Sequence, residues 1–232
     1  MMSDEQRSFL KAVVIVLVIV MLGLFFLHGG ARWLSLDFVK DHRDRLLAYT
    51  ERHYLGTLAA AAAGYVVVIA LGLPGGAVLS LAMGLLFGRL VGTVTTVLAA
   101  TAGAILAFSA ARFVFADALC ARLAARPKAA RLIEGFRENA FHYLLFLRLV
   151  PLFPFWLVNL VPAFTGMDTR TYALATLLGV IPGSFVYVNL GQTLGAIGSV
   201  RDALSGETLL ALGLLGALAL LPVLIKAARP SA

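Results

Sequence analysis

Long runs without a charged residue constrain the fold of this chain more than any other feature. Five uncharged, largely apolar runs cover residues 12–27, 54–88, 90–111, 171–200 and 208–225. A sixth run, residues 139–167, contains a single charged residue, Arg148. The hydrocarbon core of a bilayer is about 30 Å thick and is crossed by about 20 apolar residues of helix. The runs therefore predict an all-α, polytopic membrane protein.

The charged residues are too few to cover a water-facing surface. Of the 232 residues, 61% are hydrophobic and 13% are charged, and the mean hydropathy is +0.94. A soluble domain carries roughly 25% charged residues. The net charge of +7 could indicate a nucleic-acid partner, but basic residues of a membrane protein set its orientation and meet anionic lipid head groups. We therefore expect membrane lipids with anionic head groups as partners, and no nucleic acid.

Residues that could carry chemistry are sparse. Cys120 is the only cysteine, so an internal disulfide is excluded, and no Cys/His spacing typical of a metal site occurs. No apolar run contains a Ser/His/Asp set or a pair of carboxylates. We therefore expect no catalytic residues, no metal and no cofactor.

We interpret residues 1–232 as a single membrane domain that begins with two distinct segments. Residues 1–30 are predicted to form the first transmembrane helix. The alternative is a cleaved signal peptide, which is disfavoured because Asp4 and Glu5 offset its positive start. Residues 31–53 are polar, with apolar side chains at near-helical spacing, and are predicted to lie along the membrane surface.

Two apolar runs are interrupted in the middle, which predicts hairpins rather than continuous helices. Residues 54–88 are too long for one crossing and contain the sequence Gly-Leu-Pro-Gly-Gly at 72–76. Residues 139–167 are interrupted by Pro151, Pro154 and Pro162. Non-helical backbone at membrane depth is tolerated only where protein or a watery cavity covers it.

Each predicted hairpin precedes a long apolar helix, which makes an internal repeat. Repeat 1 covers residues 54–116 and repeat 2 residues 139–200, with a basic cytoplasmic linker at 117–138 and a last transmembrane helix at 208–226. The positive-inside rule places the linker and both termini in the cytoplasm. The hairpins would then enter from opposite faces, giving two inverted re-entrant hairpin-plus-helix repeats, a plan common in secondary transporters.

Arg148 is the strongest single candidate for a binding residue. An arginine at the bilayer centre is expensive and rarely lacks a partner. It could reach the interface or cap buried carbonyls, or it could anchor an anionic group at the hairpin tip. Residues 54–116 and 139–167 contain no acidic residue, so an anion is favoured over a cation. Arg89 and Arg112, which bracket the first long helix, carry the same two interpretations.

Small and amide-bearing residues are expected chiefly to pack helices together. Small residues recur at every fourth position at Gly84, Gly88, Gly92, Thr96, Ala100 and Ala104. Such a row lets helix backbones approach closely in lipid. Asn159, Tyr187, Asn189 and Gln192 are the other polar candidates and are expected to hydrogen-bond between helices.

Four segments carry a resemblance to a known family. They are LPGGAVLSLAMGLLFGRLVGT at 73–93, GAILAFSAAR at 103–112, FLRLVPLFPFWLVNLVPAFTGM at 146–167 and TLLGVIPGSFVYVNLG at 176–191. They resemble the DedA superfamily, in its VTT-domain (SNARE-associated Golgi protein) branch, over about residues 50–200. The resemblance implies two facing re-entrant hairpins and movement of lipids between leaflets: phospholipid scrambling in eukaryotic relatives, and recycling of a polyprenyl phosphate carrier in bacterial ones. The family's motif residues fall on Arg148, Pro151, Pro154, Asn159, Pro182, Gly183, Pro74 and Gly75.

The chain departs from the family pattern at the first hairpin. Members thought to be proton-coupled carry acidic residues there, whereas this chain has Gly76 and Ala77. This departure favours a passive mechanism over proton coupling, and both remain open. We expect a bacterial inner-membrane transporter or scramblase that moves anionic, phosphate-bearing lipids between leaflets. The alternatives are a secondary transporter of a small soluble anion or metabolite, and a membrane assembly factor without transport activity.

Overall fold

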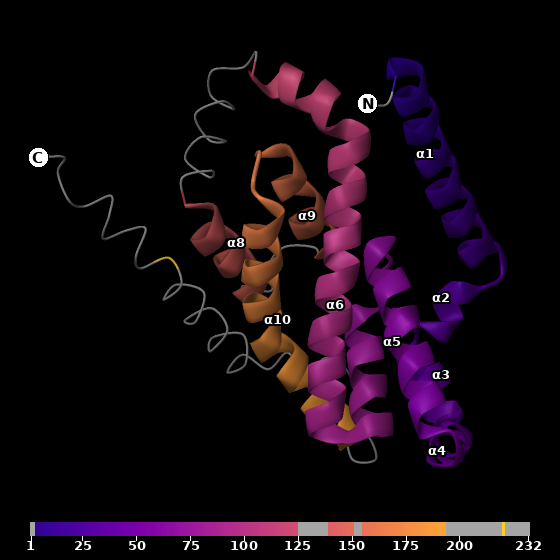
Figure 1. The fold of residues 1–232 in the computed structure, drawn as a ribbon. Helices are drawn as coiled ribbons and strands as arrows, with labels where there is room; N and C mark the ends of the chain where they lie inside the picture. The colour runs from indigo at the N-terminus through magenta and orange to yellow at the C-terminus, as the bar shows by residue number, and fades with distance from the viewer. Residues whose placement is uncertain (1–2, 125–138, 151–154, 194–219, 221–232) are drawn as a thin grey trace, which may run out of the picture.

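The computed structural model describes residues 3–124, 139–150, 155–193 and 220, and every regular element in these residues is a helix (Figure 1). Three helical stretches are long and apolar enough to cross a membrane: Glu5–Leu27, Gly76–Phe115 and Thr169–Gln192. The prediction of an all-α membrane protein is confirmed. The predicted last transmembrane helix at 208–226 lies outside the described residues, apart from residue 220.

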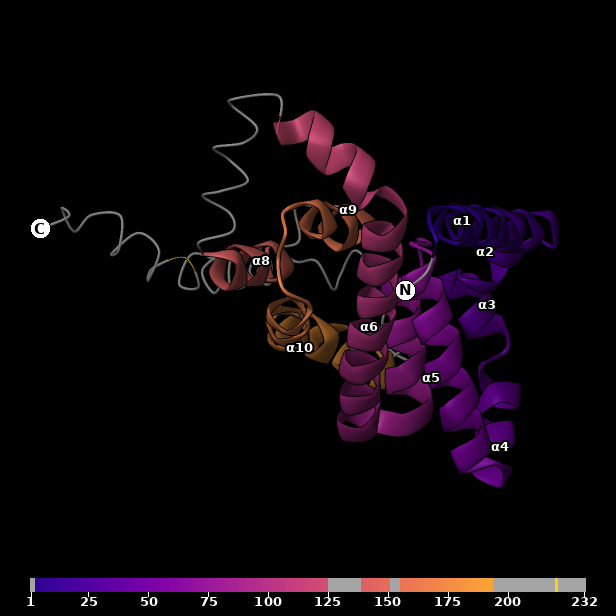
Figure 2. The same ribbon diagram turned by 45° about the horizontal axis from the view of Figure 1, so that its top comes forward.

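The first helix, α1 (Asp4–Leu27), coincides with the predicted first crossing. Ser3 begins it with a capping box: Gln6 N donates to Ser3 Oγ at 3.3 Å, and Ser3 N donates to Gln6 Oε1 at 3.1 Å. Most apolar side chains of α1 are exposed, as lipid contact requires. α1 lies at the edge of the bundle beside α6, and α8 lies on the other side of α6 (Figures 1 and 2).

The predicted surface segment 31–53 folds as three short helices. They are α2 (Gly30–Trp33), α3 (Leu36–Asp41) and α4 (Arg43–Arg52). Ser35 caps α3, because Phe38 N donates to its Oγ at 3.2 Å. Most of the charged side chains of this segment are exposed, while Val39 and Thr50 are buried. The amphipathic surface position of this segment stays a prediction.

Helical structure is interrupted at the first predicted position, residues 72–76. α5 (Tyr54–Ala70) ends before these residues and α6 (Gly76–Ala124) begins at the last of them. The bend between them needs glycine, because Gly72 and Gly75 have φ of 67° and 155°. Tyr65 ties the two helices together: its Oη lies 3.0 Å from Ser80 Oγ, and Ser80 Oγ donates to Gly76 O at 2.8 Å.

A second break lies inside α6, at a position expected to belong to a row of packing residues. Gly88 has φ of 73° and separates a first part, residues 76–87, from a second part, residues 89–124. The two parts lie against each other, since a Cβ on Gly92 would be 2.8 Å from Met83 O. The small-residue row is thus divided between two helical parts, because Gly88 provides a turn instead of a packing surface. The second part also continues past residue 116 into the predicted linker.

The second half contains α8 (Ala140–Leu149), α9 (Phe155–Leu160), the 3-10 helix η1 (Val161–Phe164) and α10 (Thr169–Gln192). Pro162 lies in η1, whereas Pro182 lies inside α10 without ending that helix. Asp168 caps α10: its Oδ2 accepts hydrogen bonds from Arg170 N at 2.9 Å and Thr171 N at 3.2 Å. Residues 151–154, which hold Pro151 and Pro154, lie outside the described residues.

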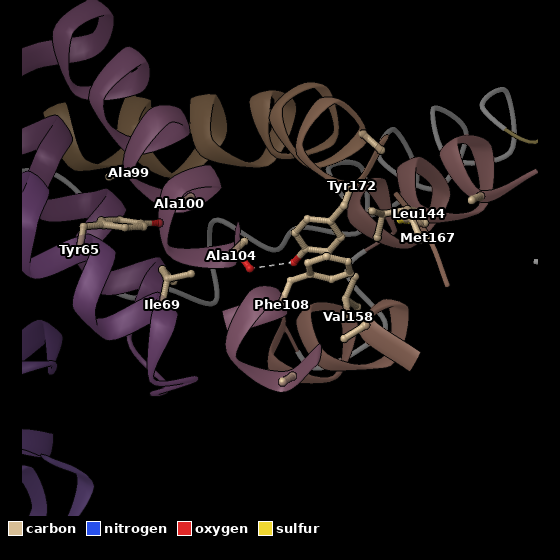
Figure 3. Close-up of a cluster of buried hydrophobic side chains, with 14 of the residues drawn as sticks. Tyr65, Ile69, Ala99, Ala100, Ala104, Phe108, Leu144, Val158, Met167 and Tyr172 are labelled. Carbon is tan, nitrogen blue, oxygen red and sulfur yellow. Dashed lines mark hydrogen bonds between the residues drawn. The ribbon is translucent and has the colours of Figure 1, made fainter. Parts of the chain in front are cut away.

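The two halves are joined where α6 crosses α10. A Cβ on Gly84 would overlap the carbonyl of Val188, and a Cβ on Gly191 would overlap the carbonyl of Leu81. Backbones approach this closely only where side chains are missing, which is how helices associate in lipid. Closer to the C-terminal end of α6, the Phe108 ring stacks on the Tyr172 ring of α10, with centroids 4.2 Å apart (Figure 3). The buried core thus runs through both halves.

Candidate functional site

A cavity of about 700 Å³ lies where the break at residues 72–76 meets the end of α8 and the start of α9. One wall is the α5–α6 bend, residues 72–76. The other walls are residues 147–150 at the end of α8, the start of α9, and one face of α10. Because the bend and α8 are far apart in sequence, the cavity exists only in the folded chain.

Arg148 occupies the last turn of α8 and lines this cavity. Its Nη2 atom donates to Tyr172 Oη at 2.9 Å and to Thr176 Oγ1 at 3.1 Å, both on α10. Its Cζ atom lies 4.8 Å from the centroid of the Phe155 ring, within the range of a cation–π contact. The guanidinium is therefore held by hydroxyl groups and aromatic rings.

Three N–H donors of Arg148 remain without a partner among the described residues. Arginine has five such donors, and the two on Nη2 are used by Tyr172 and Thr176. Nε and Nη1 are buried and make no hydrogen bond to the described residues. Arg43 and Asp44 form an ion pair at the surface, and among the described residues no acidic side chain hydrogen-bonds to Arg148. The cavity wall therefore carries an unneutralised positive charge, which an anion would compensate.

Gly179 sets the approach of α10 to Arg148. It is buried, and a Cβ on it would lie 2.5 Å from the Cβ of Arg148. Any side chain at position 179 would displace the Cβ atom of Arg148, which is fixed to the backbone, rather than the flexible end of its side chain. Glycine thus allows the two helices to place the guanidinium beside Tyr172 and Thr176.

Tyr172 extends the polar network from Arg148 to Ala104 of α6 and Asn159 of α9. Its Oη lies 3.2 Å from both Ala104 O and Asn159 Oδ1, and Figure 3 marks the bond to Ala104. Its single proton can go to either acceptor. Asn159 is fully buried and, through Tyr172, is coupled to Arg148 although it does not line the cavity.

Comparison with known proteins identifies the family of the region that holds this site. The VTT domain family matches residues 73–193, which include Arg148 and the α6–α10 crossing. This chain belongs to the VTT domain family. The resemblance seen in the sequence is confirmed.

Membrane proteins of animals, plants and amoebae are similar to this chain. Transmembrane protein 41B of Danio rerio is 30% identical over 179 residues, which are 77% of this chain and 64% of that protein. An uncharacterized membrane protein of Arabidopsis thaliana is 30% identical over 194 residues, 81% of this chain and 66% of that protein. The transmembrane protein 41 homolog of Dictyostelium discoideum is 28% identical over 189 residues, 81% of this chain and 57% of that protein. The chain thus spans less than two thirds of each of these relatives. No solved structure matches it.

Some of the predicted site residues line the same cavity as Arg148. They are Pro74 and Gly75 in the α5–α6 bend, and Gly183 and Tyr187 on α10. Pro182 is next to Gly183 but is not one of the lining residues. Pro151 and Pro154 are not described. The two halves therefore both contribute to one cavity.

The other two candidate arginines are placed elsewhere. Arg89 is exposed and follows the turn at Gly88. Arg112 donates from Nη1 to Met167 O at 2.9 Å and lies 5.8 Å from the Phe108 ring centroid. Neither lines the cavity. Arg112 thus holds a carbonyl group near the start of α10.

The other polar candidates on α10, Asn189 and Gln192, also do not line the cavity. Asn189 Oδ1 is buried without a hydrogen-bond partner in the described part of the chain, and Gln192 is exposed. Within the described residues, no group of His, Cys, Asp or Glu is arranged to hold a metal ion.

The α10 residues that hold Arg148 do not stand out in the sequence. Tyr172, Thr176 and Gly179 are spaced by four and three residues, so they share one face of a helix. This spacing was visible in the sequence. What could not be seen was that this face meets Arg148, because the contact depends on how α8 packs against α10.

Proposed function

We propose that this VTT-domain protein moves anionic, phosphate-bearing lipids between the two leaflets of a membrane, as a transporter or scramblase. The observation that carries the proposal is the guanidinium of Arg148, which lines a cavity of about 700 Å³ and has three N–H donors without a partner in the described residues. Phosphate oxygens are natural acceptors for a guanidinium. The acceptor is expected to come from the ligand, since residues 139–167 contain no acid.

The composition of the cavity wall favours an amphiphile over a soluble metabolite. Among the lining residues, a hydroxyl or a charge is present on Tyr65, Arg148, Ser184 and Tyr187, and the others are apolar or glycine. Phe155 and Trp156 line the cavity and are 37% and 50% exposed, so its wall reaches the lipid-facing surface. A lipid could therefore present its head group while its chains remain in hydrocarbon.

Two inverted re-entrant hairpins are the architecture that we propose for this movement. The break at residues 72–76 and the start of α9 line the same cavity, as expected if the two hairpins meet tip to tip. Such hairpins would place the cavity near the bilayer midplane, between the two leaflets. Attachment of reporters to each loop would test the opposite entry of the two hairpins.

We propose that the movement is passive. No acidic side chain lines the cavity in the described residues, so a carboxylate that could exchange a proton with each cycle is missing there. Dissipating a pH gradient with an ionophore should leave the exchange rate unchanged. A rate that follows the gradient would contradict passive movement.

A bacterial inner membrane with cytoplasmic termini is the compartment we propose. The basic linker 117–138 and the basic tail residues Lys226 and Arg229 support this orientation through the positive-inside rule. Membrane fractionation and protease protection of tagged termini would test the compartment and the orientation separately.

Reconstitution into liposomes tests the function. Leaflet exchange of labelled phosphatidylglycerol would be measured for the wild type, for Arg148→Ala and for Arg89→Ala, an exposed arginine outside the cavity. A charge-assisted hydrogen bond contributes about 1.5–3 kcal/mol, so Arg148→Ala should lower the rate by roughly ten-fold or more, and Arg89→Ala should not. Equal rates for the wild type and Arg148→Ala would remove Arg148 from the mechanism.

The same liposomes separate the alternatives. A transporter of a small soluble anion would release trapped phosphate without exchanging lipid. An assembly factor would show neither activity. Lipid exchange without phosphate release is the result expected here.

A further inference from the structure

A second cavity, of about 500 Å³, lies between α1 and the rest of the bundle. Its outer wall is a row of aliphatic side chains of α1: Val14, Ile15, Val18 and Ile19. Its inner wall includes the small residues Ala107, Ala110 and Ala111 of α6. Small side chains on α6 leave room that larger ones would fill. The volume falls in the range of about 300–1,000 Å³ typical of ligand pockets.

The second cavity is adjacent to the cavity of Arg148. Gly72 and Trp156 line both cavities. They also meet each other, since a Cβ on Gly72 would lie 3.5 Å from the Cβ of Trp156. Gly72 and Trp156 therefore lie between the two spaces. The first space contains a positive charge, and the second is almost entirely apolar.

Asn159 is the exception in the apolar wall. It is fully buried, and its Oδ1 lies 3.2 Å from Tyr172 Oη. Its Nδ2 has no hydrogen-bond partner among the described residues. A buried amide donor without a partner is unfavourable, so a ligand that brings an acceptor oxygen to this wall would satisfy it. A pure hydrocarbon could not.

We propose that the cavity between α1 and α6 holds a hydrocarbon chain of the same lipid whose anionic head group is bound at Arg148. The lipid passes the edge formed by Gly72 and Trp156, and an oxygen near its head group accepts a hydrogen bond from Asn159. The inference rests on the proposed function and adds a site for the chain. It identifies the substrate as an amphiphile with a long chain, recognised at both ends.

The position of α1 at the edge of the bundle explains how a chain could enter (Figures 1 and 2). The apolar side chains of α1 are largely exposed, including Val13, Val16 and Val20. In lipid, no hydrophobic force drives a chain from the bilayer into the cavity, so the fit between surfaces decides binding. The chain would therefore bind firmly only when its head group is also held.

A series of alkyl phosphates tests the inference. Binding of phosphates with chains of increasing length would be measured for the detergent-solubilised full chain. Ala110→Trp and Val14→Trp fill the second cavity from opposite walls and leave the lining of the first cavity unchanged. The control is Ala102→Trp, because Ala102 is exposed on the same helix as Ala110 and lines neither cavity. Because all variants share one detergent, partitioning of the long chains into micelles cancels in the comparison.

The wild type and Ala102→Trp should bind more tightly as the chain lengthens. The two filled variants should lose this gain, by roughly ten-fold or more for the longest chain, and should bind the shortest phosphate as the wild type does. The melting temperature of each variant checks folding, and Val14→Trp on the peripheral helix α1 serves if Ala110→Trp does not fold. Equal dependence on chain length in both folded filled variants and the wild type would overturn the inference. An affinity for the shortest phosphate that Arg148→Ala leaves unchanged would instead overturn the proposed function.

Discussion

Gly179 lies directly against Arg148, so that a Cβ on Gly179 would be 2.5 Å from the Cβ of Arg148. A glycine on α10 thereby allows the Cβ atom of Arg148 on α8 to lie against the α10 backbone. Its i−3 and i−7 neighbours on α10, Thr176 and Tyr172, then receive the hydrogen bonds of the guanidinium. The position of the charge is set by α10 as much as by α8.

Gly179→Ala should therefore lower lipid exchange by displacing Arg148. The added methyl group meets the base of the arginine, and overpacking of this kind costs about 1–3 kcal/mol. Gly183→Ala is the matched control, because Gly183 lines the same cavity on the same helix, and a Cβ added there would have no neighbouring atom within 4 Å. Exchange per folded protein should fall for Gly179→Ala and stay near the wild-type value for Gly183→Ala. Equal rates for the two variants would show that the close approach does not matter.

Tyr172→Phe should reduce both stability and exchange. It removes the hydroxyl that accepts from Arg148 and that can donate to Asn159 or Ala104. Partners left unsatisfied in a buried site cost about 1–3 kcal/mol. Tyr187→Phe also removes a hydroxyl from the wall of the same cavity, but not one that holds Arg148, and it should change the melting temperature little. A Tyr172→Phe protein that melts and exchanges lipid like Tyr187→Phe would disprove the role given to this hydroxyl.

Gly84→Ala and Gly191→Ala should each destabilise the crossing of α6 and α10. Each added Cβ would overlap a backbone carbonyl, of Val188 or of Leu81, which cannot rotate away. We expect a loss of about 1–3 kcal/mol for each, measured by denaturant unfolding in detergent. Because both changes force the same two helices apart, the double variant should lose less than the sum.

Gly64→Ala provides the control for these helix glycines. Gly64 lies in α5 with nothing within 4 Å of an added Cβ. Alanine favours helix over glycine by about 1 kcal/mol, so this variant should be as stable as the wild type or more so. A loss of stability for Gly64→Ala equal to that for Gly84→Ala would mean that the crossing is not the cause.

Arg112→Ala should separate stability from activity. Its guanidinium donates to Met167 O and does not line the cavity of Arg148. Loss of this charged hydrogen bond should lower stability by about 1.5–3 kcal/mol and leave exchange per folded protein unchanged. Arg148→Ala, in contrast, should lower lipid exchange per folded protein more than it lowers stability. Lipid exchange that falls equally in both variants at equal folded protein would argue for a substrate path that includes Arg112.

The break at residues 72–76 could be predicted from the sequence because it depends on the local backbone. Gly72 and Gly75 adopt positive φ that other residues rarely adopt, and Pro74 interrupts a helix by removing a backbone donor. The membrane-crossing helices could be predicted for a similar reason, since burial in lipid depends on the composition of about 20 consecutive residues. Gly88 shows the limit of this reasoning: its sequence neighbours suggested a packing row, but its φ of 73° provides a turn.

The sequence by itself determined that the chain lies in a membrane, where its first half breaks, and that Arg148 sits in an apolar run without an acid. Only the tertiary structure decided which arginine lines a cavity. Arg148 meets Tyr172 and Thr176, which are 24 and 28 residues away, whereas Arg112 meets Met167 across 55 residues. The physical reason is that charge and hydropathy belong to each residue, while a cavity belongs to helices that pack at positions where glycine leaves space.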